Sequence, residues 1–229
     1  MVIGCSFDYA SRIARKNPIG LVEAFIKAFP KPFSLGNNLG PWLVVKAFNP
    51  GATPPDAVAV RDAVARRPDI VLFEEHLSPE DQRAYISSLD VVASLHRSEG
   101  YGLIMLEAMA QGIPTMATEH SGNLAFMSHQ NSWLIPAQRI TIDESASPYP
   151  AGYTWAEPDI SSAASTLRWI ISGLTTATSR AAADITNRKN QALLDTEPLI
   201  NGTAGAAFVR QRLTEIRSAR NPDPAPPMG

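Results

Sequence analysis

The first two-thirds of the chain alternates short apolar runs, rich in β-branched residues, with amphipathic stretches of helical period. Six runs are predicted strands: Met1–Phe7, Trp42–Phe48, Ile70–Phe73, Asp90–Leu95, Pro114–Thr118 and Ser132–Pro136. The stretches between them are predicted helices, near residues 17–29, 56–66, 78–89, 101–111 and 122–127. Such β-α units predict a single doubly wound, Rossmann-like α/β domain with a mostly parallel sheet of about six strands and helices on both faces. In that fold the ligand site lies at the carboxyl ends of the strands.

Local signals place the ends of several helices. Asn17 and Ser78 each precede a proline, and this pairing predicts an N-cap followed by a proline in the first helical turn. Gly112 stands where the helix near 101–111 should end, because glycine is the usual residue just after a helix.

The last third loses the alternation. Proline, serine, glycine and tyrosine predominate over Ala137–Pro158, which predicts a long loop. Helices are predicted again at Asp159–Ser172, Ala177–Leu194 and Gly205–Ala219. The predicted organisation is a Rossmann-like domain over residues 1–200, a C-terminal helix over 201–220 and a disordered tail over 221–229. Because the first predicted strand begins at Met1, we expect no partner domain upstream.

Composition and charge narrow the class of protein. A chain of 229 residues with 45% hydrophobic and 18% charged residues can bury a sizeable core. Its net charge of -2 gives no field of one sign, so we expect neither nucleic acid nor an anionic membrane as partner. The single cysteine, Cys5, excludes an internal disulfide framework and a multi-cysteine zinc site. Neither a transmembrane run nor a signal peptide is recognisable, and we expect a cytoplasmic protein.

Candidate chemistry is concentrated in Ser94–Thr118, which reads SLHRSEGYGLIMLEAMAQGIPTMAT. A predicted strand ends in a polar turn, two glycines flank Tyr101, and a helix follows at once. Glycines allow a ligand to approach the backbone closely. The free N–H groups of the first helical turn, together with the helix dipole, form a site for a phosphate group.

Two carboxylates flank this turn, Glu99 before the helix and Glu107 inside it. Eight residues at about 1.5 Å each separate them by about 12 Å along the axis. Eight steps of about 100° leave them about 80° apart, so both can face one cleft. This separation suits a nucleoside diphosphate sugar, with one carboxylate on ribose hydroxyls and the other on sugar hydroxyls. The alternatives are a Glu99 that caps the helix and a Glu107 that is merely solvated.

Cations are needed beside a diphosphate flanked by acids. Arg12, Arg15 and Lys16 follow the first predicted strand, whose loop opens onto the same crevice, and Arg97 lies on the turn itself. Lys16 can neutralise a leaving diphosphate, whereas the alternative is that these are ordinary surface charges.

Other residues near the turn have structural explanations as well. The side chains of Leu103 and its apolar neighbours in the helix are expected to pack in or near the core. His96 and His120 stand near strand ends, where they either line the pocket or serve the fold.

The run Glu99-Gly-Tyr-Gly-Leu, followed by Glu107-Ala-Met-Ala and Gly112-Ile-Pro, resembles the Glu-x7-Glu segment of family 4 retaining glycosyltransferases of the GT-B type. The run RKNPIGLVEAF at Arg15–Phe25 is similar to the phosphate loop of that family, and Trp155–Asp159 is similar to a segment in one bacterial branch. The resemblance covers about residues 7–171.

This resemblance implies the C-terminal, donor-binding half of a two-domain enzyme. It implies that Glu107 contacts the ribose, Glu99 the transferred sugar, and the backbone of Tyr101, Gly102 and Leu103 the diphosphate. Lys16 matches the phosphate-binding lysine of the family, and the family's arginine five residues earlier is replaced by Ser11. Arg12 or Arg15 is then a candidate substitute, with Arg15 among the expected donor-binding residues.

Missing motifs narrow the function further. The sequence has no Asp-x-Asp, no G-x-G-x-x-G and no G-x-x-x-x-G-K-[ST], so no metal-diphosphate clamp, dinucleotide loop or P-loop is expected. We therefore expect no cofactor and no metal, since a helix dipole with Lys16 supplies the same electrostatic effect. The leading hypothesis is transfer of a sugar from a nucleoside diphosphate sugar with retention, completed by a separate acceptor domain. The alternatives are a truncated, non-catalytic module that binds the nucleotide sugar or forms a homo-oligomer, and an epimerase or phosphorylase on a related fold.

Overall fold

The computed structural model describes residues 1–32, 40–49, 51 and 56–220, with side chains as far as residue 215. A six-stranded sheet has the order β3-β2-β1-β4-β5-β6, and all neighbouring strands are parallel. The strands are β1 (Val2–Asp8), β2 (Trp42–Phe48), β3 (Ile70–Phe73), β4 (Val91–Ser94), β5 (Thr115–Thr118) and β6 (Trp133–Ile135). The predicted doubly wound α/β fold is confirmed, with each predicted strand in place.

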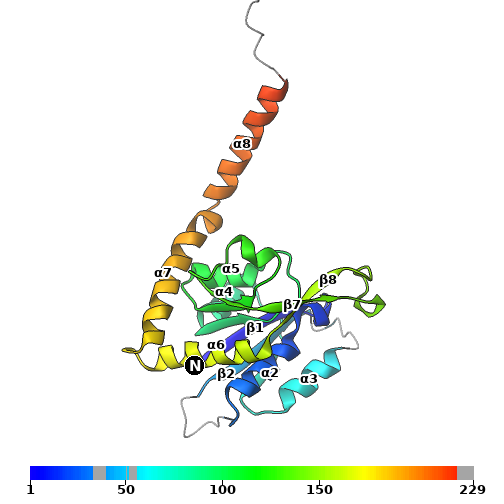
Figure 1. The fold of residues 1–229 in the computed structure, drawn as a ribbon, viewed down its shortest axis with the longest axis vertical. Coiled ribbons are helices and arrows are strands. Elements are labelled where there is room, and N and C mark those ends of the chain that lie inside the picture. The colour runs from blue at the N-terminus through cyan, green and yellow to red at the C-terminus, as the bar shows by residue number, and fades with distance from the viewer. Residues whose placement is uncertain (33–39, 50, 52–55, 221–229) are drawn as a thin grey trace, which may run out of the picture.

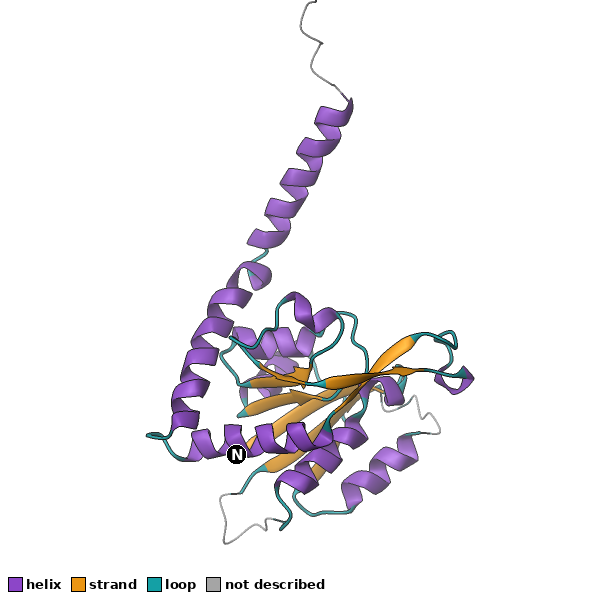
Figure 2. Cartoon of the chain, in the orientation of Figure 1, coloured by secondary structure: helices purple, strands orange, loops and turns teal. Residues whose placement is uncertain are grey.

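Helices cover both faces of the sheet, as Figures 1 and 2 show. One face carries α2 (Pro18–Ala28), α3 (Ala57–Ala65) and α6 (Ile160–Thr175). The other carries α4 (Pro79–Ser87), α5 (Leu103–Ala110) and the 3-10 turn η1 (Gly122–Ala125), with part of α7 (Arg180–Ile200). The single helical turn α1 (Ile13–Lys16) follows β1 directly.

The side chains of the strands pack into two apolar cores, one on each face of the sheet, because successive residues point to opposite faces. On β4, Val91 and Ala93 pack into the core under α2 and α6, while Val92 packs into the core under α5. With both faces buried, a parallel sheet of this kind reads as short, nearly continuous apolar runs, and this is why the strands were recognisable.

Two predicted N-caps are present. The Asn17 side chain accepts a hydrogen bond from the Gly20 N–H at 3.2 Å, and the Ser78 hydroxyl accepts one from the Asp81 N–H at 3.0 Å. Both helices begin with the proline that follows the cap. α2 is thereby fixed with its first turn at the carboxyl end of the sheet, next to the loop that carries Lys16.

The predicted loop over Ala137–Pro158 is wrong. Strands β7 (Ala137–Thr141) and β8 (Thr154–Pro158) form an antiparallel hairpin, with the 3-10 turn η2 (Glu144–Ala146) between them. Ile140 lies opposite Trp155, and the hairpin has a small core of Ile142, Ala146 and Trp155. Its few apolar residues are dispersed among polar ones, so the composition of this segment gave no signal for either strand.

The C-terminal part is helical. α7 continues to Ile200, so its predicted end at Leu194 is wrong: Pro198 lies in the last turn, where its missing N–H removes one helical bond. α8 (Thr203–Arg220) follows and extends away from the sheet (Figure 1). The predicted disordered tail, 221–229, lies outside the described residues. Among the helices described, none has the length and apolar character needed to span a membrane.

Candidate functional site

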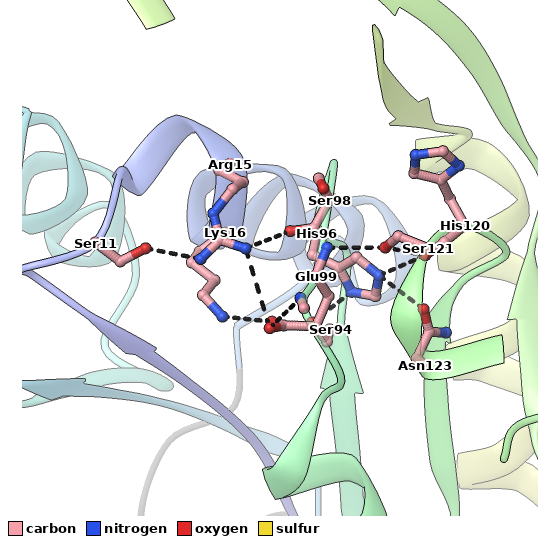
Figure 3. A network of polar contacts seen from close by, with 11 residues as sticks. Ser11, Arg15, Lys16, Ser94, His96, Ser98, Glu99, His120, Ser121 and Asn123 are labelled. Atoms are coloured by element: carbon pink, nitrogen blue, oxygen red, sulfur yellow. Dashed lines mark hydrogen bonds and ion pairs between the residues drawn. The ribbon is translucent and has the colours of Figure 1, made fainter. Parts of the chain in front are cut away.

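The site lies where the strand order reverses, between β1 and β4. β1 pairs with β2 on one side and with β4 on the other. The chain leaves these strands in opposite directions, which opens a crevice at their carboxyl ends. The two loops meet there: the Arg97 N–H, after β4, donates to the Arg15 carbonyl, after β1, at 2.8 Å. Figure 3 shows the polar contacts between them.

A cleft of about 430 Å³ opens at this point. It is lined by six of the seven predicted site residues: Lys16, Glu99, Tyr101, Gly102, Leu103 and Glu107. The two carboxylates thus face one hollow, as their spacing predicted. The structure gives their surroundings, while their roles toward a ligand stay predictions.

The beginning of α5 is shaped by Gly102. This residue has φ 93°, in the left-handed region, and a Cβ built on it would lie 2.4 Å from the terminal methyl carbon of Met105. Its carbonyl accepts the N–H groups of Met105 and Leu106 at 3.0 and 3.1 Å. The N–H groups of Leu103 and Ile104 precede the first intrahelical bond and lie on the cleft, so they are open to an anion.

The turn before α5 is fixed from the neighbouring strand-to-helix turn. The Glu99 N–H donates to the Ser121 hydroxyl at 2.8 Å, and the Gly122 N–H donates to the Glu99 carbonyl at 3.1 Å. A Cβ at Gly122 would lie 1.9 Å from the Gly100 carbonyl oxygen, so only glycine fits there. The Glu99 backbone is therefore held independently of any ligand.

Lys16 and Glu99 form an ion pair between the two loops (Figure 3). Their side chains are 18% and 14% exposed, and the Gly100 N–H donates to the Glu99 carboxylate at 2.9 Å. Burial acts to raise the pKa of Glu99, but Lys16, the Gly100 N–H and Arg15 outweigh it and hold the pKa below its ordinary value. The Glu99 carboxyl group is therefore charged at neutral pH.

Arg15 lies behind this pair and does not line the cleft. Its Nη1 donates to the Ser98 carbonyl and its Nη2 to the Ser11 hydroxyl, both at 2.8 Å, and the Glu99 carboxylate is 4.0 Å away. The Arg15 guanidinium therefore occupies the space beside Ser11. Its expected contact with a donor stays a prediction.

Arg12 and Arg97 are bound elsewhere. Arg97 makes two hydrogen bonds to the Glu157 carboxylate and donates to the Ala14 carbonyl at 2.6 Å. Arg12 donates to the Ser145 carbonyl and lies 3.9 Å from Asp56. Among the described residues that line the cleft, Lys16 is the only cation.

Glu107 differs from Glu99 in its surroundings. Among the described residues, none makes a hydrogen bond or an ion pair with its half-buried carboxylate. Burial raises its pKa above the ordinary value, which the charge of Arg83 only partly offsets. A desolvated acceptor without a partner is poised to accept hydrogen bonds from a ligand.

His96 has a structural role in the described fold. It is buried, with its Nδ1 3.0 Å from the Ser94 hydroxyl and its Nε2 3.1 Å from the His120 carbonyl and 3.2 Å from the Asn123 amide oxygen. Burial is the largest cause of its lowered pKa. Neither His96 nor His120 lines the cleft.

Several residues that line the cleft were not predicted from the sequence as site residues. They come from the ends of β1, β2 and β4 and from α4, and they include Ser6, Asp8, Phe48, Ser94 and Gln82. The Gln82 side-chain oxygen is buried without a hydrogen-bond partner in the described structure. The signal that was available is position, since Asp8, Phe48 and Ser94 each end a parallel strand. The described residues contain no group of three or more side chains of His, Cys, Asp or Glu arranged to hold a metal ion.

A family model described as glycosyl transferases group 1 matches residues 14–145, more than half of the chain. The chain belongs to this family. Its group 1 domain contains both loops of the cleft, and the resemblance inferred from the Glu-x7-Glu segment is confirmed at the level of the family. A search of curated proteins by sequence gave no match.

Solved structures share the fold of this group 1 domain. The C-terminal domain of a group 1 family protein from Francisella tularensis is 18% identical, with a TM-score of 0.56 over 85% of this chain and 83% of that one. A glycosyltransferase from Rickettsia africae is 16% identical, with a TM-score of 0.63 over 97% of this chain and 48% of that one. A protein from Anabaena, HepE, solved with UDP and glucose, is 15% identical, with a TM-score of 0.60 over 92% and 48%. The chain thus spans about half the length of the last two.

Proposed function

We propose that this chain binds a nucleoside diphosphate sugar in the cleft and is the donor-binding part of a retaining glycosyltransferase. One observation carries the proposal: the open N-terminus of α5, the Lys16 ammonium and two carboxylates face one hollow. A helix N-terminus with a cation beside it suits a diphosphate, and carboxylate oxygens, which have several acceptor positions each, suit the hydroxyls of sugars. Membership of the group 1 family supports this chemistry.

Each residue then has a role. The N–H groups from Tyr101 to Leu103 and the Lys16 ammonium hold the diphosphate. Glu107 accepts hydrogen bonds from ribose hydroxyls, which provide the partner that its carboxylate lacks. Glu99, fixed by its turn, accepts from the transferred sugar. The relative solved with UDP and glucose supports a donor of this class.

In the proposed reaction, the bond between the anomeric carbon and the diphosphate oxygen breaks, and its electron pair stays on the diphosphate. An acceptor hydroxyl oxygen forms the new bond to the anomeric carbon and releases its proton. Lys16 and the dipole of α5 stabilise the charge on the diphosphate, an effect that requires no metal. Arg15 adds to the positive potential from behind Glu99 and fixes the Ser98 carbonyl of the turn. The binding site for the acceptor is supplied by a part outside this chain. We therefore expect the chain alone to bind the donor and to transfer little sugar.

Calorimetric titration with UDP-, GDP- and ADP-glucose tests the proposal. We expect saturable binding of at least one of them, weakened at least tenfold by Glu99→Ala and by Glu107→Ala. Glu197→Ala, on the exposed face of α7, is the matched control. Binding of none at millimolar concentration, or equal binding by all three variants, would overturn the proposal.

The alternative, a non-catalytic module that associates with itself, has one observation in its favour. α8 carries exposed apolar side chains, among them Phe208, Val209 and Leu213. Size-exclusion chromatography with and without nucleotide distinguishes the two functions, since a stable oligomer indifferent to nucleotide favours the alternative.

A further inference from the structure

The β7–β8 hairpin, residues 137–158, has no part in the main sheet, yet it contacts both loops of the candidate site. The family match ends at residue 145, so most of the hairpin lies beyond it. Three arginines lie in the two loops that carry Lys16 and Glu99, and each has a partner on the hairpin. Arg12 donates to the Ser145 carbonyl, Arg15 lies 5.9 Å from the Tyr149 ring centre, and Arg97 binds the Glu157 carboxylate through two nitrogens.

The first chain of contacts leads from the hairpin to Lys16. Lys16 ends α1, a helix of four residues, and one helical turn is too short to be stable alone. Arg97 secures this turn by donating to the carbonyls of Ala14 and Arg15. The hairpin in turn secures Arg97, through the bidentate Glu157 carboxylate and through the Ala156 N–H, which donates to the Arg97 carbonyl at 2.9 Å.

The second chain of contacts leads from the hairpin to Glu99. Tyr149 packs edge-on against the buried Trp155 ring, at 5.7 Å between centres, and presents its face to the Arg15 guanidinium. Arg15 donates to the Ser98 carbonyl, one residue before Glu99. Both partners of the ion pair that faces the cleft are therefore linked to the hairpin, Lys16 through Arg97 and Glu99 through Arg15.

The charges lead to the same conclusion. Guanidinium groups without partners beside an anion site would compete with Lys16 for the ligand. All three have partners, and each has one on the hairpin: the Ser145 carbonyl for Arg12, the Tyr149 ring for Arg15 and the Glu157 carboxylate for Arg97. Among the described residues on the cleft, this leaves Lys16 as the single cation.

We infer that the β7–β8 hairpin positions the diphosphate end of the site and that Tyr149 is a positioning residue, which acts through Arg15. This inference rests on the proposed function for the nature of the ligand. Tyr149 suits a test because its replacement changes no charge. Its side chain is also exposed enough, at 36%, for the fold to tolerate truncation.

The test compares full-length Tyr149→Ala and Tyr149→Phe with a control on the same hairpin, Tyr153→Ala, at a residue that is 64% exposed. The probes are UDP, GDP and ADP. The nucleoside that corresponds to the tightest-binding diphosphate is measured beside it. We expect Tyr149→Ala to bind the diphosphate about fivefold more weakly and the nucleoside unchanged, since only the anion end loses its support. Tyr149→Phe, which keeps the ring, and Tyr153→Ala should stay within twofold of the wild type.

Equal diphosphate affinity in Tyr149→Ala and the wild type would overturn the inference. So would an equal loss for diphosphate and nucleoside, since the ring would then serve the whole fold. Hydrogen–deuterium exchange of the free protein separates this failure from that of the proposed function. Tyr149→Ala, but not Tyr153→Ala, should speed exchange over residues 13–17 and 97–100. If the wild type binds no nucleotide, the proposed function fails, and the exchange rates still decide whether the hairpin fixes these loops.

Discussion

Replacing Lys16 by methionine removes the one cation that the described cleft presents and keeps most of the side-chain volume. The Lys16 and Glu99 side chains are 18% and 14% exposed, so the effective dielectric constant lies between that of the interior and that of water. Two unit charges 4 Å apart interact by about 4 kcal/mol at an effective dielectric constant of 20 and about 1 kcal/mol in water. We therefore expect Lys16→Met to weaken nucleoside diphosphate binding by about 2–3 kcal/mol, or about 30- to 150-fold.

The same substitution should also destabilise the fold. The Glu99 carboxylate would keep the Gly100 N–H at 2.9 Å and Arg15 at 4.0 Å, but it would lose its closest counter-ion. Removal of one partner from a fully buried pair costs about 3–5 kcal/mol, and partial exposure reduces this to about 1–2 kcal/mol. Lys16 lowers the pKa of Glu99, so its contribution to stability is present at neutral pH. It is lost as the pH falls through that lowered pKa, and the two proteins should converge in stability at strongly acidic pH.

Calorimetry with a nucleoside diphosphate and its nucleoside, alongside urea unfolding at pH 7, measures both effects. The nucleoside should bind Lys16→Met as it binds the wild type, because it lacks the diphosphate. Lys31→Met, on an exposed lysine beyond the far end of α2, is the matched control. Diphosphate affinity equal to that of the wild type, or an equal loss for the nucleoside, would show that Lys16 does not bind the diphosphate.

Three further substitutions are informative. Glu107→Gln should weaken nucleotide-sugar binding and yet raise the Tm at pH 7. Burial raises the pKa of Glu107, so its charged form destabilises the folded protein at neutral pH. The gain in Tm should vanish below about pH 4, where the glutamate is protonated. Gly102→Ala should lower the free energy of unfolding in urea by about 1–2 kcal/mol, because Gly102 has a φ of 93° and a Cβ there would contact Met105. Gly100→Ala is the control and should leave the free energy of unfolding unchanged, because a Cβ at Gly100 meets no atom within 4 Å. Because the pKa of His96 is lowered, the stability of the wild type should fall as the pH drops below about 6.5. His96→Asn should be less stable than the wild type at pH 7, but its stability should fall less over the same pH range.

The strands and helices that build the cleft could be predicted because their signals are local. An Asn17-Pro18 or Ser78-Pro79 pair fixes where a helix begins, and a short apolar run between two amphipathic stretches fixes a buried strand. The β7–β8 hairpin could not be predicted in this way. Its stability comes from the pairing of Ile140 with Trp155 and from contacts with Arg97, which is distant in the sequence.

The same distinction applies to the site. The spacing of Glu99 and Glu107 along one turn and helix was enough to bring both to a single cleft. The position of Arg15 was not predictable, because it depends on Ser98 and Tyr149, which other loops supply. The structural role of His96 depends likewise on Asn123, across a neighbouring turn. Sequence spacing thus predicted contacts within one element, whereas contacts between elements required the fold.

An NMR titration of the ¹⁵N-labelled chain with UDP-, GDP- and ADP-glucose tests whether the start of α5 binds a nucleoside diphosphate sugar, because it reports where a ligand binds. We expect saturable shift changes for at least one of them, largest at the amides of Gly102, Leu103 and Ile104 and extending to Lys16. Absence of shifts at millimolar ligand would contradict this expectation, as would shifts confined to a surface away from the start of α5.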